Sequence, residues 1–265
     1  MTTTSASPEP TAPSHALRAH SFNAAAAQYA ANRPSYPPAL FDTVEELAGR
    51  PLSGARVVDV GAGTGIATTL LDTRGADILA VEPGAGMAAE FRRALPHIPI
   101  VRGNGNALPV ADAQADFLTY AQAWHWTDPA HSVPEALRVL RPGGALALWW
   151  NADALDVEWI ADAADRIYRF FGIDTAAEKR RAGDRTDLAD PSGRLRFTRR
   201  EVRWSRRIPI DTHLANIGSH SGFLVTPEER RNAFLQEERG HVLKVFPDGI
   251  VEETYDVLLL VATKP

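Results

Sequence analysis

The chain has 265 residues, a formal net charge of −5 and a 45% share of hydrophobic residues, which suits one large globular domain or two small ones. It contains no cysteine, which excludes disulfides, cysteine-ligated zinc or iron–sulfur clusters and a cysteine nucleophile. The acidic balance argues against a dedicated nucleic-acid-binding protein, because neutralising phosphates needs a basic face.

Neither end of the chain carries a signal for secretion or for a membrane span. Residues 1–15 are mostly Thr, Ser, Pro and Ala without an apolar segment, so we predict a disordered tail rather than a signal peptide. The longest apolar run near the other end, 257–262, has the length of a buried strand. We therefore expect a cytoplasmic protein that has no membrane partner.

Hydrophobic periodicity predicts alternating helices and strands through the first 151 residues. The predicted helices are 21–31, 37–49, 66–74, 85–95 and 132–140, the last beginning with a capping box at Ser132. The predicted strands are 56–60, 78–81, 100–101, 117–121 and 145–150. Alternation of this kind indicates a parallel sheet that is covered by helices on both faces.

Beyond residue 151 the pattern changes. We predict a helix over 157–171, a polar stretch to about 194, an arginine-rich strand over 196–208, a helix over 227–246 capped by Thr226, and a final strand over 254–263. The arginines alternate with apolar residues, which favours a strand with one solvated face over an RNA-binding segment. We therefore expect no nucleic-acid partner.

The strongest chemical signal is the segment VVDVGAGTGIAT at 57–68. An apolar strand leads there into Gly61, Gly63 and Gly65, which let the backbone turn sharply and approach a ligand without a Cβ in the way. The following helix points its free N–H groups and positive dipole end at the same place, the ligand crevice of an open α/β sheet. The dinucleotide fingerprint GxGxxG fails because its third glycine position is Ile66, and no Walker Gly-Lys-Ser/Thr follows.

Two carboxylates stand beside the glycine loop and are candidate cofactor ligands. Glu82 ends the second predicted strand, where its oxygens can accept hydrogen bonds from both hydroxyls of a ribose; the alternative is a solvated strand end. Asp59 lies two residues before Gly61. For Asp59, direct ligand contact and ordering of the loop through backbone N–H groups are equal alternatives.

Further motifs accompany the glycine loop in a fixed order. They are YAANRPSYP at 29–37, VEPGAGM at 81–87, RGNGNALPV at 102–110, AQAWHW at 121–126 and LRPGGALAL at 140–148. Together with VVDVGAGTG, these segments resemble the class I S-adenosylmethionine (SAM)-dependent methyltransferases, in the small-molecule group called type 11. The resemblance covers about 22–151 and does not extend to the last third of the chain.

The resemblance implies an α/β fold with a Rossmann-like seven-stranded sheet, whose last strand is antiparallel, and with helices on both faces. It implies a methyltransferase domain over 16–265, in which 16–151 binds SAM and 152–265 supplies a C-terminal substrate cover and the last two strands. Such covers vary with the substrate, so the sequence is least informative about the acceptor.

The resemblance also assigns each part of SAM to residues of this chain. The backbone of Gly61 and Gly63 passes beneath the methionine moiety, Glu82 binds the ribose, and Pro83 and Met87 pack on the adenine ring. Six further residues complete the implied site: Asn104 and Gly105 at the adenine edge, Ala121 and Gln122 near the methionine ammonium, and Tyr29 and Arg33 at the methionine carboxylate.

Methyl transfer from a sulfonium depends mainly on positioning and on excluding water, so we expect neither a metal nor a covalent intermediate. If the acceptor is a hydroxyl, His125 is the best-placed general base, the alternative being a structural or solvent-facing histidine. His213 and His220, in the expected cover, are secondary candidates. Four tryptophans near the strand ends either wall a partly apolar acceptor site or pack in the core: Trp124, Trp126, Trp149 and Trp150.

These inferences predict SAM-dependent methyl transfer to a small-molecule acceptor such as a secondary metabolite. Two other hypotheses stay open at this point. One is a SAM-binding enzyme that is not a methyltransferase, such as a cyclase, and the other is a regulatory SAM-binding module. Transfer of a labelled methyl group from SAM separates both from a methyltransferase.

Overall fold

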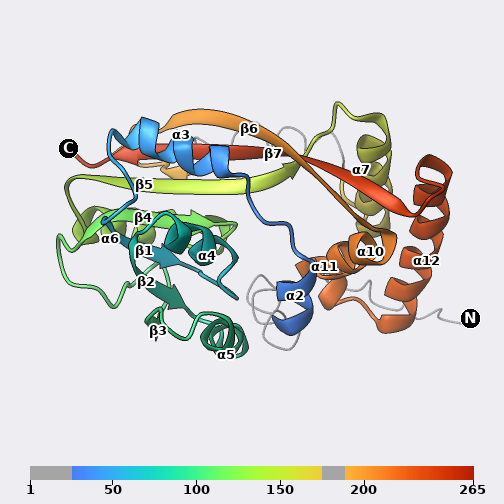
Figure 1. Ribbon diagram of the computed structural model, residues 1–265, viewed down its shortest axis with the longest axis horizontal. Helices are drawn as coiled ribbons and strands as arrows, with labels where there is room; N and C mark the ends of the chain where they lie inside the picture. Colours follow the sequence, from blue (N-terminus) through green and yellow to red (C-terminus); the bar gives the residue numbers. More distant parts are fainter. Residues whose placement is uncertain (1–25, 175–188) are drawn as a thin grey trace, which may run out of the picture.

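The computed structural model of the protein describes residues 26–174 and 189–265. The tail expected at 1–15 and the middle of the polar stretch expected after residue 171 lie outside these described residues. Within them the chain forms one seven-stranded sheet, with helices along its faces and a group of helices beyond one end (Figure 1).

The sheet has the topology that the family resemblance implies. Its strands are β1 (Arg56–Val60), β2 (Asp77–Glu82), β3 (Ile100–Arg102), β4 (Ala115–Ala121), β5 (Leu140–Asp153), β6 (Thr198–Pro209) and β7 (Ile250–Thr263), in the spatial order β3-β2-β1-β4-β5-β7-β6. β1 to β5 pair in parallel, whereas β7 runs antiparallel to β5 and β6. The carboxyl ends of β1, β2 and β4 therefore meet at one edge, where open α/β sheets bind ligands.

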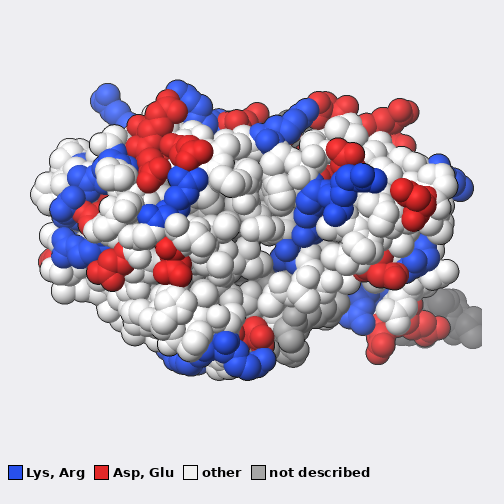
Figure 2. All heavy atoms as spheres, in the orientation of Figure 1, with Lys and Arg blue, Asp and Glu red and all other residues white. Residues whose placement is uncertain are grey.

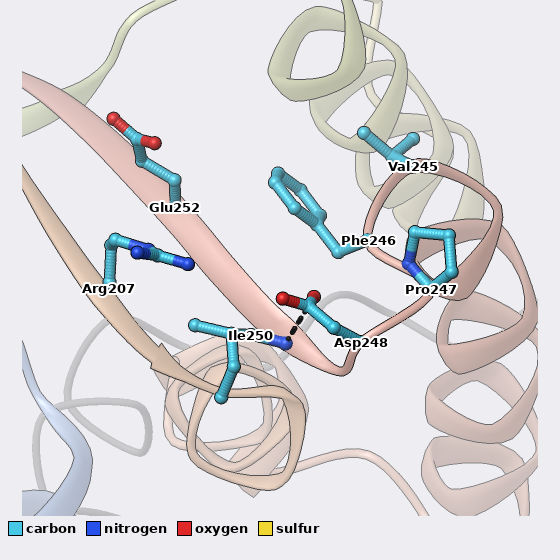
Figure 3. Close-up of a pocket in the computed structure, with 7 residues that line it drawn as sticks. All are labelled: Arg207, Val245, Phe246, Pro247, Asp248, Ile250 and Glu252. Atoms are coloured by element: carbon cyan, nitrogen blue, oxygen red, sulfur yellow. Dashed lines mark hydrogen bonds between the residues drawn. The ribbon is translucent and has the colours of Figure 1, made fainter.

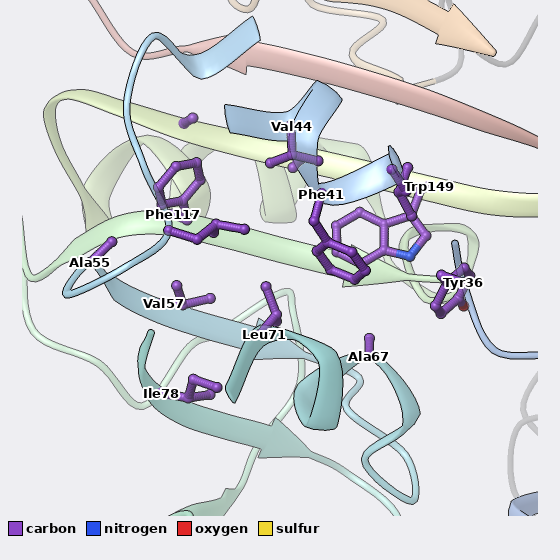
Figure 4. Packing of buried hydrophobic residues seen from close by; sticks show 14 of the residues in the cluster. Tyr36, Phe41, Val44, Ala55, Val57, Ala67, Leu71, Ile78, Phe117 and Trp149 are labelled. Carbon is purple, nitrogen blue, oxygen red and sulfur yellow. The ribbon is translucent and has the colours of Figure 1, made fainter. Parts of the chain in front are cut away.

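Helices cover both faces of this sheet. The helices are α2 (Ala26–Asn32), α3 (Pro38–Ala48), α4 (Ile66–Thr73), α5 (Ala85–Ala94), α6 (Pro129–Val139), α7 (Glu158–Phe171), α10 (Ile210–Gly218), α11 (Ser221–Leu224) and α12 (Glu228–Val245), with a 3₁₀ turn η1 (Trp124–Trp126). Buried residues of α3 and α4 share one apolar cluster with the sheet, and those of α6 share a second. In the first, the Trp149 ring lies 5.9 Å from the rings of Tyr36 and Phe41 (Figure 4).

The start of α6 corrects the predicted capping box. The helix begins at Pro129, and its cap is Asp128, whose Oδ1 accepts a hydrogen bond from the Ala130 N–H at 3.0 Å. The Ser132 hydroxyl instead donates to the Asp128 carbonyl. A proline at the first helical position already has the helical φ, so the Asp-Pro pair starts the helix before Ser132 is reached.

Three further features differ from the predicted pattern. β5 begins at Leu140, not at 145, because Leu140 pairs with Ala115 and the RPGG segment is a register irregularity within the ladder. Thr226 does not cap α12, since its hydroxyl donates to the Gly222 carbonyl of α11 at 2.8 Å. The prediction also missed α10 and α11, which fill the connection between β6 and α12.

A separate group of helices lies beyond the end of the sheet, formed by α7, α10, α11 and α12 and here called the C-terminal helical region. β6 and β7 run from the sheet into it (Figure 1). It has an apolar cluster of its own, in which Phe223 is fully buried and lies 5.3 Å from the stacked ring of Phe170. This part of the chain is therefore stabilised by its own core as well as by the sheet.

The predicted arginine-rich strand is confirmed as β6, the exposed edge of the sheet. Two of its arginines pair with acids of β7, Arg203 with Asp256 at 2.8 Å and Arg206 with Glu253 at 2.7 Å. Basic and acidic side chains are also interspersed over the face shown in Figure 2. Among the described residues, no helix is both long and apolar enough to cross a membrane.

Candidate functional site

The loop between β1 and α4 has a backbone that glycine adopts easily and other residues do not. Gly61, Gly63 and Gly65 have φ angles of +68°, +59° and +94°, a region that costs other residues about 1–2 kcal/mol. A Cβ at Gly61 would lie 2.5 Å from the Ala123 Cβ, so the turn also needs the space. The Gly61 N–H donates to the Val81 carbonyl at 2.8 Å, which holds the loop against β2.

A hollow that is partly open to solvent lies over this loop. A Cβ at Gly63 would have only the Gly61 carbonyl within 4 Å, so the backbone there faces open space rather than packed atoms. Besides the loop, the hollow is lined by Arg33, Pro34, Tyr36, Ala121, Gln122 and Asn151. The structure thus brings five of the predicted residues together: Arg33, Gly61, Gly63, Ala121 and Gln122.

Glu82 lies at the end of β2, beside the loop, and is 6% exposed. Its Oε2 accepts a hydrogen bond from the Gly63 N–H at 2.9 Å, and its Oε1 accepts one from the Gly84 N–H at 2.6 Å. Burial raises the pKa of Glu82, and these two hydrogen bonds oppose the rise. Each carboxylate oxygen keeps a second lone pair, so the ribose role predicted for Glu82 is chemically compatible with the geometry.

Asp59 is fully buried behind the loop. Its carboxylate accepts hydrogen bonds from the hydroxyls of Thr68 on α4, at 2.6 Å, and Thr119 on β4, at 2.9 Å. Burial raises the pKa of Asp59 to about 6, although both hydroxyls lower it. Asp59 therefore joins α4 and β4 to β1 through side chains, not through the backbone N–H groups considered above, and it does not line the hollow.

The residues predicted for the adenine lie on the connections that follow β2 and β3. Met87 is buried on α5, whereas Pro83 and Asn104 are exposed. The Asn104 Oδ1 accepts a hydrogen bond from the Asn106 N–H at 3.0 Å, which makes a tight turn. Gly105 lies inside this turn, where a Cβ would come within 3.0 Å of neighbouring side chains. Their contacts with adenine stay a prediction.

Gln122 has an unusual backbone conformation beside the hollow. Its φ is +57°, in the left-handed region that few non-glycine residues occupy. The conformation is fixed by a hydrogen bond from its N–H to the Trp149 carbonyl at 2.9 Å and by one from Nε2 to the Asn151 carbonyl at 3.4 Å. Strained residues of this kind concentrate at functional sites, so the geometry supports the predicted placement of Gln122 at a ligand.

The two residues predicted for the methionine carboxylate differ in what the structure describes. The backbone of Tyr29 belongs to α2, but its side chain lies outside the description. Arg33 lines the hollow, and its guanidinium donates to the Ser219 carbonyl at the end of α10, at 3.2 Å. Arg33 therefore connects the hollow to the C-terminal helical region.

Sequence reasoning missed Tyr36 and Asn151 as lining residues. Tyr36 is 8% exposed and belongs to the YAANRPSYP motif, which offered a signal for it. Asn151 donates from Nδ2 to the Ser35 carbonyl at 3.1 Å and accepts at Oδ1 from the Trp204 indole at 3.0 Å. It fixes the connection between α2 and α3 at the hollow, which only the three-dimensional structure shows.

His125 is exposed on η1, at the end of β4. Its Nδ1 accepts a hydrogen bond from the Trp150 indole N–H at 3.1 Å, so the neutral ring carries its proton on Nε2. Trp124, Trp149 and Trp150 are all at most 4% exposed and pack in the core. This placement favours the packing alternative for these three tryptophans. The catalytic role of His125 stays a prediction.

The secondary candidates His213 and His220 lie in the C-terminal helical region. His213 is on α10, with its Nδ1 2.6 Å from the Oε1 of Glu253. His220 precedes α11, and burial together with the nearby charge of Arg33 lowers its pKa to about 3. The two histidines are therefore held in different environments, one paired with a carboxylate and the other kept neutral.

A second hollow lies at the turn between α12 and β7 (Figure 3). It is lined by Arg207, Val245, Phe246, Pro247, Asp248, Ile250 and Glu252. The hydrogen bond drawn there, from the Ile250 N–H to the Asp248 carboxylate at 3.1 Å, closes the turn itself. Within the described parts of the chain, no group of three or more His, Asp or Glu side chains has metal-binding geometry.

Comparisons with known proteins agree on one family. Residues 58–148 match the family model described as a methyltransferase domain. An uncharacterised methyltransferase of Mycobacterium tuberculosis is 35% identical over 219 residues, which is 83% of this chain and 84% of that protein. A demethylmenaquinone methyltransferase of Beutenbergia cavernae is 37% identical over 107 residues, 40% of this chain and 44% of that one.

The fold comparison covers more of the chain. The structure of a protein from Anaeromyxobacter dehalogenans that is described as a type II methyltransferase superposes with a TM-score of 0.64. It is 25% identical in sequence, and the match covers 87% of this chain and 97% of that one. The fold similarity therefore extends over most of the chain.

Proposed function

The chain belongs to the class I SAM-dependent methyltransferases, and we propose that it holds SAM in the hollow over the glycine loop and transfers the methyl group to a small-molecule acceptor such as a secondary metabolite. The observation that carries this proposal is the hydrogen bond from the Gly63 N–H to the Glu82 carboxylate. The backbone of Gly63 faces open space, and the buried carboxylate bonded to its N–H stands at the rim of the same loop.

The groups around the hollow fit the parts of SAM. Gly61 and Gly63 would carry the methionine moiety on bare backbone, and Glu82 would accept the ribose hydroxyls. Arg33 lines the hollow, and its guanidinium would bind the methionine carboxylate. The remaining proposed contacts are those of Tyr29, Pro83, Met87, Asn104, Gly105, Ala121 and Gln122.

The chain itself would contribute to catalysis by positioning SAM and the acceptor and by excluding water from them. When bound, SAM supplies an electrophilic methyl group on a sulfonium. Buried aromatic rings border the hollow on one side, where Tyr36 packs edge-on against Trp149, and they would keep water from the reacting groups. Residues 152–265 include the C-terminal helical region, which would cover the acceptor.

Calorimetry with SAM and S-adenosylhomocysteine tests the cofactor part. We expect Glu82→Gln to weaken binding about tenfold to a hundredfold, because one charge-assisted hydrogen bond of about 1.5–3 kcal/mol is lost while the shape is kept. The matched control is Asp77→Asn, at the exposed start of the same strand. Unchanged affinity in folded Glu82→Gln protein would contradict the ribose role.

Incubation of cell extract with methyl-labelled SAM and the protein tests the transfer part. We expect the label in a molecule of low mass that is extracted away from protein and nucleic acid. Label retained on macromolecules would contradict a small-molecule acceptor. Tight SAM binding without any transferred label would favour a SAM-binding protein with another role.

A further inference from the structure

A buried polar cluster joins α10, β6 and β7 in the C-terminal helical region. At its centre is Glu253, which is 4% exposed and accepts hydrogen bonds from the Arg206 guanidinium at 2.7 Å and the Tyr255 hydroxyl at 2.6 Å. His213 completes the cluster, with Nδ1 2.6 Å from the same carboxylate. Burial alone raises the pKa of Glu253, but the hydrogen bonds of His213 and Tyr255, with the charge of Arg206, lower it to about 2.

This pairing fixes which nitrogen of His213 carries the proton when the ring is neutral. An ionised carboxylate can only accept hydrogen bonds, so the Nδ1 of His213 carries the proton that faces Glu253. In the neutral ring the other nitrogen, Nε2, is then a bare lone pair. The arrangement of a carboxylate behind a histidine is the one that orients a general base and stabilises its protonated form.

The Nε2 atom of His213 is buried, and among the described residues no hydrogen-bond donor reaches it. The Oδ1 atom of Asn216 is in the same situation on the same helix face. The Nδ2 of Asn216 is used, since it donates to Tyr255 at 3.3 Å. A buried acceptor without a partner is energetically unfavourable, which points to a ligand that brings the missing donors.

The cluster adjoins the hollow over the glycine loop. Arg33 lines that hollow and donates to the Ser219 carbonyl at the end of α10, the helix that bears His213. From the other side, Arg206 donates to the carbonyls of Asn32 and Arg33, at 3.1 and 3.4 Å. The same short segment of chain therefore borders both the proposed SAM site and the His213 cluster.

We propose that His213, oriented by Glu253, is the general base that deprotonates the methyl acceptor, and that the acceptor presents a neutral O–H or N–H group to His213 and Asn216. This inference rests on the proposed function. It sets the nucleophile class, because both unpartnered atoms are hydrogen-bond acceptors and a carboxylate ligand would bring them no proton. Asn216 binds the acceptor, and Glu253 is a positioning residue.

In this step the acceptor's lone pair forms the bond to the methyl carbon while its O–H or N–H bond breaks. The proton moves to the Nε2 of His213. The bond between the methyl carbon and sulfur breaks, and its electron pair stays on sulfur, so the sulfonium becomes a neutral thioether. The Nδ1 proton remains on His213, and the negative charge of Glu253 stabilises the imidazolium.

The geometry favours His213 over His125 for this role. The Nδ1 of His125 is engaged as an acceptor by the Trp150 indole, so its neutral ring has its proton, and not a lone pair, on Nε2. Titratable and charged groups face His213 from each neighbouring element: Arg33, Asp153, Arg206, His220, Glu253 and Tyr255.

The test uses the full chain with three probes of equal ring size. Phenol and aniline carry a transferable proton, and benzoate at neutral pH does not. With SAM present, we expect methylated phenol or aniline and no methyl benzoate. We expect His213→Gln, which can still donate to Glu253, to lower kcat about a hundredfold and to abolish the rising limb of the pH profile. Asn216→Ala should raise KM for phenol, and His241→Gln on α12 is the matched control.

A second readout decides the inference if turnover is too slow to measure. In histidine-labelled protein, nitrogen NMR should show His213 protonated on Nδ1, and phenol should shift its Nε2 signal while benzoate does not. An Nε2 signal that phenol leaves unchanged, preferential methylation of benzoate, or wild-type kinetics in His213→Gln would overturn the proposal. The NMR measurement is made with and without S-adenosylhomocysteine. Calorimetry shows separately whether SAM binds, so a failure of the proposed function is distinguished from a failure of this inference.

Discussion

The half of the molecule that contains the glycine loop and the half that contains the C-terminal helical region each bury a carboxylate, and the surroundings of the two shift the pKa in opposite directions. Asp59, behind the glycine loop, accepts hydrogen bonds from the hydroxyls of Thr68 and Thr119, and burial raises its pKa to about 6. Glu253, in the C-terminal helical region, is bonded to Arg206 and other groups that lower its pKa to about 2. One half therefore holds a carboxyl group whose pKa is raised towards neutral pH, and the other holds one whose pKa is lowered well below it.

The difference teaches where each half obtains its polar chemistry. The glycine loop presents backbone groups to the hollow, from a turn that needs Gly61 and Gly63. In the C-terminal helical region the corresponding groups are side chains in a charged network. The first site depends on backbone conformation, whereas the second depends on charge-assisted hydrogen bonds that orient its side chains.

The largest expected effect comes from breaking the charged network. Glu253→Ala leaves the Arg206 guanidinium and the His213 ring without their buried partner, which we expect to lower the free energy of unfolding by about 3–5 kcal/mol. The matched control on the same strand is Asp256→Ala, whose pair with Arg203 is exposed and should matter little. Denaturant unfolding of both variants measures the difference. Equal losses would mean that the burial of Glu253 has no special weight.

The next largest effect concerns the glycine loop. Gly61→Ala meets both an unfavourable φ of +68° and the Ala123 Cβ at 2.5 Å, so we expect a loss of about 3 kcal/mol and of SAM binding. Gly63→Ala has a similar φ but open space, and we expect a loss of only about 1 kcal/mol. Thermal unfolding and calorimetry of the pair separate conformational strain from crowding. A Gly63→Ala variant as unstable as Gly61→Ala would show that crowding is irrelevant.

The two carboxylates should also give opposite pH dependences. Because its folded pKa is raised, Asp59 contributes its full stability below about pH 3.8 and loses it as the pH rises through about 6. Asp59→Asn should therefore gain on the wild type by at most about 3 kcal/mol between pH 3.5 and 7. The contribution of Glu253 runs the other way, being present above pH 4.5 and lost as the pH falls through about 2.

The measurement is the free energy of unfolding of wild-type, Asp59→Asn and Glu253→Gln proteins across this range. Asp77→Asn, at the exposed start of β2, is the control for a carboxylate at the surface. A difference between wild type and Asp59→Asn that does not grow with pH would contradict the raised pKa of Asp59.

The same contrast explains what the sequence could predict. The turn at Gly61 to Gly65 has a backbone conformation that strongly favours glycine. The glycines in the sequence therefore predict the turn and its role directly. β1 was predicted with its observed bounds, and Glu82 was placed beside the loop because it ends the next parallel strand along the chain. Local sequence patterns of this kind predict the local structure that the folded chain adopts.

The side-chain site gives no such signal. His213 and Glu253 are 40 residues apart, and Arg33 and Ser219 are 186 apart. Their residue types are common, and they become neighbours only when β6 and β7 extend past the sheet into the C-terminal helical region. Sequence reasoning therefore ranked His125 above His213, because His125 is adjacent to a motif. The partner of each nitrogen, which separates the two histidines, is a property of the fold.

The smallest expected effect concerns the N-terminal cap of α6, where a side chain in the half that contains the glycine loop stabilises a helix. The structure makes Asp128 the cap of α6, with Oδ1 accepting from the Ala130 N–H at 3.0 Å, where the sequence pattern favoured Ser132. Asp128→Ala should lower the melting temperature by about 2–4 °C, as expected for a lost cap in a chain of this size. Asp128→Asn should leave it almost unchanged, because asparagine caps helices equally well. If both substitutions lower the melting temperature alike, the charge of Asp128 matters beyond the cap, and its contact with His131, at 3.0 Å, becomes the explanation to test.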